Sequence, residues 1–380
     1  MIRIVHVIAD LSIGGAEMML ARIIGAMDRH AFETTVVTLT GDGPLRETIE
    51  GLGVPVRTLG MHRKFDAALA LVALTRLLRH LRPHVIQTWM YHSDLLGGLA
   101  ARGAGSVPVV WGVRQSAFRP QDLPLTTRWT LQACARLSWK LPTRIVCCSE
   151  AARRTHAAYG YSREKMVVIP NGFDLSTFKP DPEARSAVRQ ELGLPPGSPL
   201  IGLIARFHPQ KDHQTFLRAA ALLAARRPDV HFLLCGDGIT WDNPALTAWI
   251  MAAGLRGRLH LLGPRRDVPR LSAALDVATS SSAYGEAFPN AVGEALACGV
   301  PCVVTDVGDS ADVVGEAGRV VPPRDPAALA RAWEELLALE ESERCSLGLQ
   351  GRARVQARFS LSQVAAEYER LYGGIVKRQA

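Results

Sequence analysis

Two glutamates lie eight residues apart late in the chain, in the segment Glu286-Ala-Phe-Pro-Asn-Ala-Val-Gly-Glu294. Pro289 suits the first turn of a helix, because the amide hydrogen that proline lacks would have no helical partner there. We therefore expect Glu286 in a loop and Glu294 on the following helix, whose first amides could bind anionic or hydroxyl-bearing groups. Glutamates at this spacing also occur on ordinary solvated helices, but the small, apolar neighbours argue against that reading.

A pair of cations, Arg206 and Lys211, follows the apolar stretch Leu200–Ala205, which we expect to be a strand. Arginine offers a planar fork of donors and lysine a compact charge, so the two together could clamp a diphosphate. The alternative is ordinary surface charge. The carboxyl end of a predicted strand, where ligands bind in open α/β sheets, favours the clamp.

Glycine-rich turns follow two other predicted strands, at residues 2–8 and 231–235, and are candidate ligand loops: Gly14 with Gly15, and Gly236 with Asp237 and Gly238. Glycine lets a ligand approach the backbone closely. Neither turn is a complete G-x-G-x-x-G sequence, so a dinucleotide cofactor is poorly supported and an ordinary strand-to-helix turn remains the alternative.

Three polar residues after predicted strands are weaker candidates: His92, Arg114 and Arg265. A single histidine is more often structural than catalytic, but His92 lies in a polar cluster and could bind a hydroxyl or share in proton transfer. We expect the neighbouring Asp94 to cap a helix. Arg114 could meet a phosphate, and the loop of Arg265 could contact a base.

Strand-like and helix-like segments alternate along both halves of the chain, which predicts parallel sheets with crossover helices. The expected strands include residues 2–8, 34–39, 85–88, 109–112 and 144–148, then 200–205, 231–235, 259–262, 277–280 and 302–305. A helix is expected over residues 66–81. The turn-rich sequence at residues 169–174 divides the chain into domains of residues 1–169 and 170–360, with a ligand site expected in the cleft between them.

The 380 residues carry a net charge of +8, and residues 1–169 hold 21 Lys and Arg against 12 Asp and Glu, a local excess of +9. An anionic membrane, a phosphate-bearing acceptor or no partner at all would fit this excess. Nucleic acid is not expected, since no binding motif is present. The seven cysteines form no C-x-x-C pair, and neither a signal peptide nor an apolar run of membrane-spanning length is found, so we expect a cytoplasmic protein.

Together these residues resemble the retaining nucleotide-sugar glycosyltransferases of family four. Glu286 and Glu294 match that family's E-x7-E motif, and Arg206 with Lys211 its R-x4-K motif. The first glycine loop and the Pro-Asn-Gly-Phe-Asp connector at residues 170–174 match as well. Any one of these motifs is weak, but the ordered set over the whole chain is specific.

The resemblance implies the GT-B fold, an α/β architecture of two Rossmann-like parallel-sheet domains facing a central cleft. Residues 1–169 would form the acceptor-side domain and residues 170–360 the nucleotide-sugar-binding domain. The C-terminal helix, residues 361–380, would pack back on the first domain.

The resemblance also assigns roles. Glu294 would bind the ribose and Glu286 the donor sugar, together with backbone amides of the segment Phe288, Pro289 and Asn290. Arg206 and Lys211 would stabilise the leaving diphosphate in place of a metal, and His92 would lie near the donor sugar. No D-x-D motif is present, so no metal or other cofactor is expected.

Many relatives have Gly-Phe-Gly after the first acid, whereas this chain has Ala-Phe-Pro-Asn. That variant resembles exopolysaccharide and capsule glycosyltransferases. We therefore expect transfer of a hexose or N-acetylhexosamine, with a UDP-sugar as donor, to a glycan or polyprenyl-diphosphate-linked acceptor in surface polysaccharide synthesis. The basic first half would then contact the anionic inner face of the cell membrane.

Two alternatives stay open. A nucleotide-sugar 2-epimerase of the same fold would need additional acid and base carboxylates. A catalytically silent nucleotide-sugar-binding protein would bind a nucleotide without transferring sugar.

Overall fold

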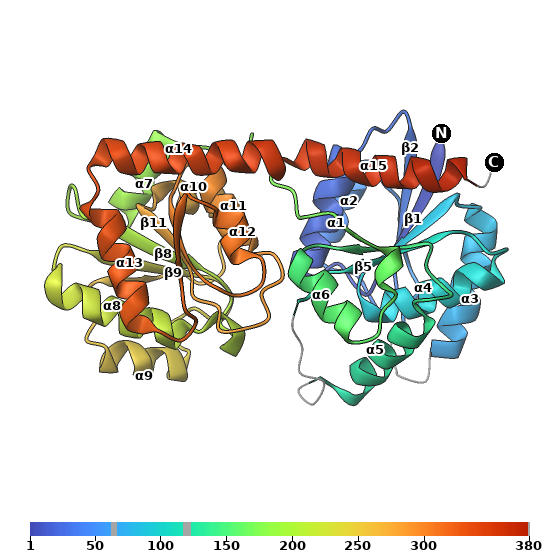
Figure 1. The fold of residues 1–380 in the computed structure, drawn as a ribbon, viewed down its shortest axis with the longest axis horizontal. Coiled ribbons are helices and arrows are strands. Elements are labelled where there is room, and N and C mark those ends of the chain that lie inside the picture. Colours follow the sequence, from blue (N-terminus) through green and yellow to red (C-terminus); the bar gives the residue numbers. More distant parts are fainter. Residues whose placement is uncertain (62–66, 117–122, 379–380) are drawn as a thin grey trace. The chain divides into compact units, whose positions relative to one another are not determined.

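The computed structural model describes residues 1–61, 67–116 and 123–378. It divides the chain into two compact units (Figure 1). The N-terminal unit comprises Met1–Gly172 and the C-terminal segment from Leu361, and the C-terminal unit comprises Phe173–Ser360. The chain therefore passes between the units once at Gly172–Phe173, inside the predicted connector, and once at Ser360–Leu361.

The N-terminal unit is built on a parallel sheet of seven strands in the order β3-β2-β1-β4-β5-β6-β7. Its central strands are apolar runs buried on both faces, as parallel sheets covered by helices require. The strands are β1 Ile2–Ile8, β2 Phe32–Thr38, β3 Val56–Thr58, β4 Val85–Thr88, β5 Val109–Val113, β6 Arg144–Cys147 and β7 Met166–Val168.

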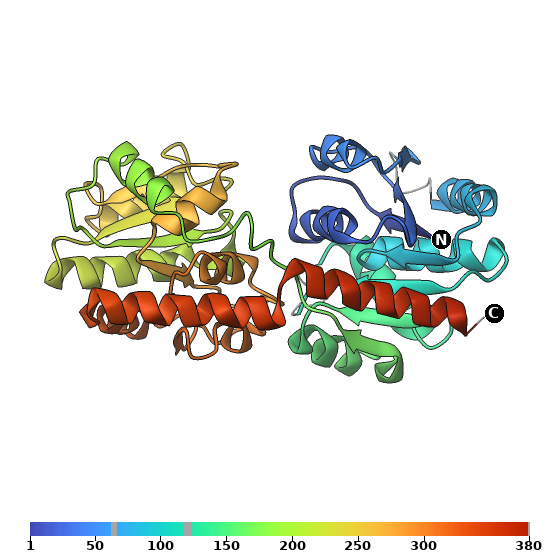
Figure 2. The same ribbon diagram turned by 90° about the horizontal axis from the view of Figure 1, so that it is seen from above.

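Seven α-helices of the described residues belong to this unit: α1 Gly15–Ala26, α2 Leu45–Gly51, α3 Ala67–Leu81, α4 Tyr91–Gly103, α5 Leu125–Leu137, α6 Glu150–Ala158 and α15 Leu361–Lys377. Helix α15 lies along the unit (Figure 2), and its buried face, including Val364, Tyr368 and Tyr372, joins the core formed by β1, α1 and β4. Part of the helix predicted over residues 66–81 and the last residues of that predicted over 361–380 lie outside the described residues.

The C-terminal unit repeats this plan with a parallel sheet of six strands in the order β10-β9-β8-β11-β12-β13. The strands are β8 Leu200–Ile204, β9 His231–Cys235, β10 Leu259–Leu261, β11 Val277–Ser280, β12 Cys302–Thr305 and β13 Gly318–Val321. Strands β7 and β13, at the sheet edges, were not predicted; they are short, and each keeps two of its residues only partly buried or exposed.

The helices of this unit are α7 Pro182–Glu191, α8 His213–Arg226, α9 Pro244–Ala252, α10 Val268–Ala274, α11 Asn290–Ala297, α12 Ser310–Val314, α13 Pro326–Ala338 and α14 Glu341–Arg358. Their apolar faces close a core in which Trp333 contacts Phe216 and Phe232. The prediction of two parallel-sheet α/β units is therefore confirmed.

Strand order reverses at one point in each sheet, between β1 and β4 in the N-terminal unit and between β8 and β11 in the C-terminal unit. The crossover helices on either side of such a point lie on opposite faces, which leaves a crevice beyond the carboxyl ends of the two strands. The predicted Gly14 and His92 follow β1 and β4, and the predicted Lys211 and Glu286 follow β8 and β11.

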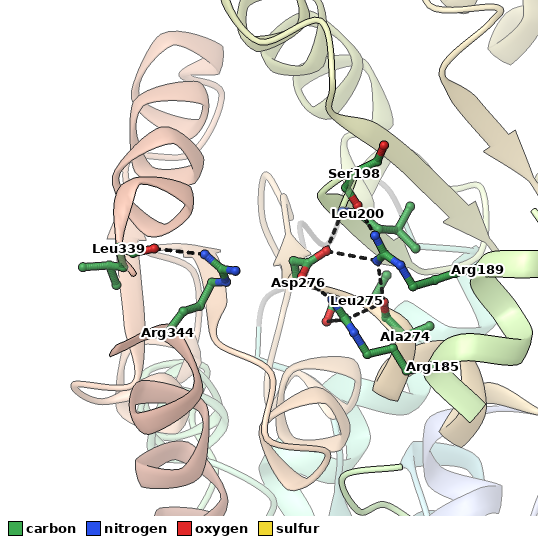
Figure 3. Close-up of polar contacts among 9 residues, drawn as sticks. All are labelled: Arg185, Arg189, Ser198, Leu200, Ala274, Leu275, Asp276, Leu339 and Arg344. Atoms are coloured by element: carbon green, nitrogen blue, oxygen red, sulfur yellow. Dashed lines mark hydrogen bonds and ion pairs between the residues drawn. The ribbon is translucent and has the colours of Figure 1, made fainter. Parts of the chain in front are cut away.

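At the opposite, amino-terminal ends of the strands in the second sheet, a buried carboxylate holds neighbouring elements together (Figure 3). Asp276, at the entry to β11, forms ion pairs with Arg185 at 2.6 Å and Arg189 at 3.2 Å, both on α7. It also accepts a 2.7 Å hydrogen bond from the amide of Leu200 at the start of β8. These contacts tie α7 to the two strands whose far ends carry Lys211 and Glu286.

Candidate functional site

The centre of the candidate site is an ion pair between Lys211 and Glu286, formed inside the C-terminal unit. The two residues are 75 positions apart in sequence. They meet because β8 and β11 are neighbours in the sheet and end at the same edge. Glu286 is 7% exposed, and the hydroxyl of Ser282 donates a second hydrogen bond of 2.8 Å to the carboxylate oxygen that Lys211 contacts.

Hydroxyl groups at the end of β11 also hold the backbone around this pair. Ser281 donates to the carbonyl of Lys211 at 2.8 Å, and Thr305 of β12 donates to the carbonyl of Ser282 at 2.6 Å. The amide of Ala283 donates to the carbonyl of Gln210 at 2.8 Å. Neither serine nor Thr305 was predicted as a site residue, although the run of serines at residues 280–282 was a visible signal.

The turn that presents Lys211 has an uncommon backbone conformation. Asp212 lies in the left-handed region, with φ of 47°, which costs energy for a residue other than glycine. Its carboxylate caps α8 by accepting hydrogen bonds from the amide and hydroxyl of Thr215, at 3.1 and 2.7 Å. The cap offsets the strain and fixes the direction in which the preceding Lys211 leaves the turn.

Glu294 lies on α11, whose first residue is Asn290, and it is 9% exposed. Pro289 precedes the helix in an extended conformation as its N-cap, rather than within the first turn as predicted. The ring of Phe288 is buried and packs against Phe173, with ring centroids 6.0 Å apart. Only the backbone of Phe288 is therefore placed to meet a ligand.

A glycine on the neighbouring loop packs closely against the backbone of Glu286. Gly308 has φ of 63°, and a Cβ atom there would fall 1.6 Å from the carbonyl oxygen of Glu286. The amide of Asp309 donates to the carbonyl of Ala287 at 3.2 Å. Sequence reasoning missed Gly308, because only the close approach of two loops reveals the need for glycine.

The loops after β8 and β9 are joined through their backbones. The amide of Phe207 donates to the carbonyl of Asp237 at 2.7 Å, and a Cβ at Gly236 would fall 2.3 Å from the carbonyl oxygen of Ala205. Gly238 has φ of 71°, a conformation that favours glycine. The exposed Arg206 thus stands beside the predicted glycine turn.

The electrostatic environment of the loop after β8 is positive. The pKa of His208 is lowered, first by desolvation and then by the charges of Arg206 and Lys211. A neutral histidine between two cations leaves the loop suited to an anionic group.

Arg265 has its guanidinium engaged locally. It forms two hydrogen bonds of 2.8 Å with Asp267 and an ion pair of 2.8 Å with Glu191. The structure does not bring this side chain to the Lys211–Glu286 pair; its contacts hold the β10–α10 loop to α7.

In the N-terminal unit, Gly14 is the N-cap of α1, which begins at Gly15 directly after the β1 turn. A Cβ at Gly14 would fall 2.2 Å from a carboxylate oxygen of Glu17. His92 is the second residue of α4 and is exposed over part of its surface, while desolvation by the surrounding protein lowers its pKa. The imidazole is therefore neutral near pH 7, a form that can both donate and accept a hydrogen bond.

Asp94 does not cap α4 as predicted, because it lies inside the helix and is fully buried. It accepts hydrogen bonds from the hydroxyl of Thr88 at 2.5 Å and from the amide of Gly112 at 3.3 Å. Met90, the N-cap, has φ of 69°. Asp94 thereby anchors the turn that carries His92, and burial raises the pKa of its carboxyl well above the usual range.

Arg114 is held within the N-terminal unit. Its guanidinium donates to Asn171 of the connector at 2.7 Å and to the hydroxyl of Tyr368 on α15 at 2.5 Å. The guanidinium carbon also lies 4.6 Å from the centre of the Trp89 ring. These contacts show Arg114 fastening the connector and α15 to the sheet.

No three His, Cys, Asp or Glu side chains are grouped as a metal site in the part of the chain that the structure describes. Across the same residues, no helix has the length and apolar character needed to cross a membrane.

Two family models match the chain. The first, described as "Glycosyltransferase Family 4", matches residues 13–177, and the second, described as "Glycosyl transferases group 1", matches residues 198–339. A D-inositol 3-phosphate glycosyltransferase from Xylanimonas cellulosilytica is 30% identical over 311 residues, which is 78% of this chain and 73% of that protein. The chain belongs to glycosyltransferase family 4.

Another glycosyltransferase is similar over a shorter stretch. The UDP-Gal:alpha-D-GlcNAc-diphosphoundecaprenol alpha-1,3-galactosyltransferase of Escherichia coli is 31% identical over 244 residues, 63% of this chain. The aligned part spans 62% of that protein, slightly less than two thirds of its length.

A solved structure supports the fold. The crystal structure of Anabaena HepE in complex with UDP has a TM-score of 0.86 and 23% identity, and covers 98% of this chain and 100% of that one. The likeness confirms a GT-B architecture of two Rossmann-like units for this family 4 chain.

Within this family 4 chain, the site geometry divides the predicted residues into two groups. Lys211 and Glu286 are in direct contact, and the loop of Arg206 adjoins the turn of Asp237. Arg114 and Arg265 are instead engaged in contacts that hold the scaffold. The first group offers cations beside a buried carboxylate, an arrangement suited to binding a molecule that has both a diphosphate and hydroxyl groups.

Proposed function

We propose that the protein transfers a hexose or N-acetylhexosamine from a UDP-sugar, with retention and without a metal, to a glycan or polyprenyl-diphosphate-linked acceptor in surface polysaccharide synthesis. The observation that carries the proposal is the Lys211–Glu286 pair at the strand-order reversal of the C-terminal unit. Two similar proteins support the donor and acceptor classes: the E. coli relative is a galactosyltransferase that uses UDP-Gal and a diphosphoundecaprenol-linked sugar, and HepE was crystallised with UDP-glucose.

In the proposed reaction the bond between the anomeric carbon and the diphosphate breaks, and negative charge collects on the leaving diphosphate. Lys211 and Arg206 would stabilise that charge, because fixed cations at the place where charge develops need no reorganisation during the reaction. Lys211 pairs with Glu286 in the structure. Donor binding would draw Lys211 toward the diphosphate and leave Glu286, still held by Ser282, to accept hydrogen bonds from the sugar.

The other predicted residues complete the proposed donor and acceptor sites. Glu294 would bind the ribose, and the backbone at residues 288–290 would meet the sugar. In the N-terminal unit, the Gly14–Gly15 turn and the neutral His92 would contact substrate. The proposed location is the cytoplasmic face of the cell membrane, where polyprenyl-linked acceptors reside.

The test measures UDP-sugar turnover and nucleotide binding in parallel. Glu286→Gln preserves the shape of the side chain and should lower turnover by about 100-fold while UDP still raises the melting temperature. Ser282→Ala should lower turnover less, because it removes one hydrogen bond that orients Glu286 but keeps the carboxylate itself. The Asp276→Asn variant serves as a control for the effect of reduced stability on turnover, since Asp276 lies at the opposite, amino-terminal ends of the strands.

The outcomes separate the alternatives. Full turnover in Glu286→Gln would refute the assignment of this carboxylate to the donor site. Conversion of the UDP-sugar to its 2-epimer, with no transfer, would favour the epimerase. Binding of UDP without turnover of any donor would favour a silent nucleotide-sugar-binding protein.

A further inference from the structure

An open hollow of about 600 Å³ lies in the N-terminal unit, lined by Trp139 just after α5 and by residues of α6 and the turn after it. Its charged lining residues are Arg153, Arg154 and Arg163. None of the described residues assigned above to sugar transfer lines this hollow. The lining therefore brings three guanidinium groups to one aromatic wall, at a place that the transfer reaction does not use.

Two of these arginines are available to bind an external anion. Arg153 forms an ion pair of 2.8 Å with Glu150, one turn earlier on α6. Arg154 and Arg163 are exposed, and neither has an ion pair within the described chain. An exposed guanidinium beside a concave surface presents a fork of donors that matches the oxygens of a phosphate group.

The segment that includes the residues of the hollow carries most of the net positive charge of the chain. Residues 123–165 contain eight Lys and Arg against two Asp and Glu, a net charge of +6 in a chain whose total is +8. No acidic residue occurs between residues 123 and 149. The pKa of Lys165 is lowered first by burial and then by the nearby charges of Arg144 and Arg102.

Exposed aromatic and aliphatic side chains accompany these cations. Trp139 is 56% exposed, and Lys165 holds its backbone by donating to its carbonyl at 2.6 Å. On α5, labelled in Figure 1, Leu125 and Trp129 are 67% and 66% exposed. Arg136 follows them on the same helical stripe and is also exposed.

Exposed tryptophan and leucine beside arginine is the pattern of a surface that sits at the boundary between water and lipid. The indole ring enters the headgroup layer while the cations pair with phosphates. A soluble phosphate compound would account for Arg154 and Arg163, but not for the exposed Trp129 and Leu125 on α5. The apolar part therefore favours a bilayer over a free anion.

We propose that the α5–α6 surface, comprising the arginine hollow with Trp139 and the exposed stripe of α5, docks on the phosphate headgroups of an anionic lipid bilayer. This inference deepens the membrane contact within the proposed function and rests on it for its purpose, the capture of a lipid-linked acceptor. Lipid binding itself requires no sugar transfer.

The first test is flotation of the full chain with vesicles of phosphatidylglycerol and phosphatidylcholine, compared with phosphatidylcholine alone. Wild-type protein should float with the anionic vesicles only, and added salt should weaken the binding. Arg154→Glu with Arg163→Glu should weaken binding by about 30-fold or more, from roughly 1 kcal/mol for each basic residue at a membrane surface.

The matched control is Arg29→Glu with Arg57→Glu, which changes the charge of the same unit equally at two exposed positions away from the hollow lining. It should leave vesicle binding within a few-fold of wild type. Equal losses in both double variants would overturn the assigned surface and indicate non-specific attraction. Trp139→Ser should reduce the binding that persists in high salt, and an unchanged salt-resistant fraction would count against the aromatic contact.

Further measurements keep this inference separate from the transferase proposal. The Arg154→Glu, Arg163→Glu variant should retain wild-type melting temperature and UDP-sugar turnover in detergent-free solution. Turnover by a wild-type protein that binds no anionic vesicles would overturn the docking surface alone. Stabilisation by inorganic phosphate that depends on Arg154 and Arg163, without vesicle binding, would replace the lipid with a soluble phosphate compound.

Discussion

The coupling between Lys211 and Glu286 should change when a donor nucleotide binds. The pair is partly buried, with side-chain exposures of 24% and 9%. For unit charges about 4 Å apart, an effective dielectric of about 20 gives an upper value of about 4 kcal/mol, from which desolvation of both groups must be subtracted. We therefore expect a net coupling of about 1–3 kcal/mol in the ligand-free protein.

A double-mutant cycle measures this value. Lys211→Met, Glu286→Gln and the double variant are unfolded by denaturant alongside wild type, first without nucleotide and then at saturating UDP. Lys211→Met removes the ion-pair partner of a buried carboxylate, so it should be the less stable single variant. The double variant should recover part of that loss, because the buried charge that lost its ion pair is no longer present.

With UDP bound, Lys211 is expected to face the diphosphate, and the coupling to Glu286 should fall below about 0.5 kcal/mol, the scatter of such cycles. Lys211→Met should also weaken UDP binding by 10-fold or more, from roughly 1.5–3 kcal/mol for a hydrogen bond to a charged group. An equal coupling with and without UDP would refute the exchange of partners and leave Lys211 as a structural support for Glu286.

Two further predictions concern buried carboxylates outside the site. Asp94 has a pKa raised by burial, so the native state holds its proton at pH values where the unfolded chain has lost it, and stability falls as pH rises from the unfolded pKa toward the folded one. Asp94→Asn keeps an acceptor for Thr88 and Gly112 and should remove that part of the pH dependence; an identical pH profile of unfolding would contradict the raised pKa. Asp276→Asn should lower the free energy of unfolding by about 2–4 kcal/mol, because Arg185 and Arg189 lose a paired charge, while the UDP-sugar KM stays unchanged. A changed KM would show that the two ends of these strands are coupled.

The alternation of apolar strands and amphipathic helices made the fold class predictable from sequence, because strands buried between two helical layers must be apolar on both faces. The edge strands β7 and β13 escaped prediction, since a short strand that is only partly buried lacks that signal. The same limit explains Asp94, which has the residue type of a helix cap but satisfies its hydrogen bonds across the sheet, with Thr88 and Gly112.

The candidate site shows a similar division. Spacing and residue type predicted Glu286 and Lys211 as site residues, because both follow predicted strands and both carry charge suited to a nucleotide sugar. The structure brings these two side chains into contact. The sequence could not distinguish them from Arg114 and Arg265, which also follow predicted strands. In the structure the guanidinium of Arg114 contacts Asn171 and Tyr368. That of Arg265 contacts Asp267 and Glu191. That difference depends on which side chains arrive from elsewhere in the chain.

Taken alone, the sequence determined the two α/β units and the glycosyltransferase family, since these follow from local patterns of polarity, turn residues and motif order. The charged residues proposed to bind a diphosphate stay a prediction. Only the tertiary structure decided that Ser281 and Ser282 hold the Lys211–Glu286 pair, that Gly308 must lack a side chain behind Glu286, and that the arginines of α6 share a hollow with Trp139. Each of these depends on a close approach between segments separated in sequence, and strand order, rather than local spacing, brings such segments together.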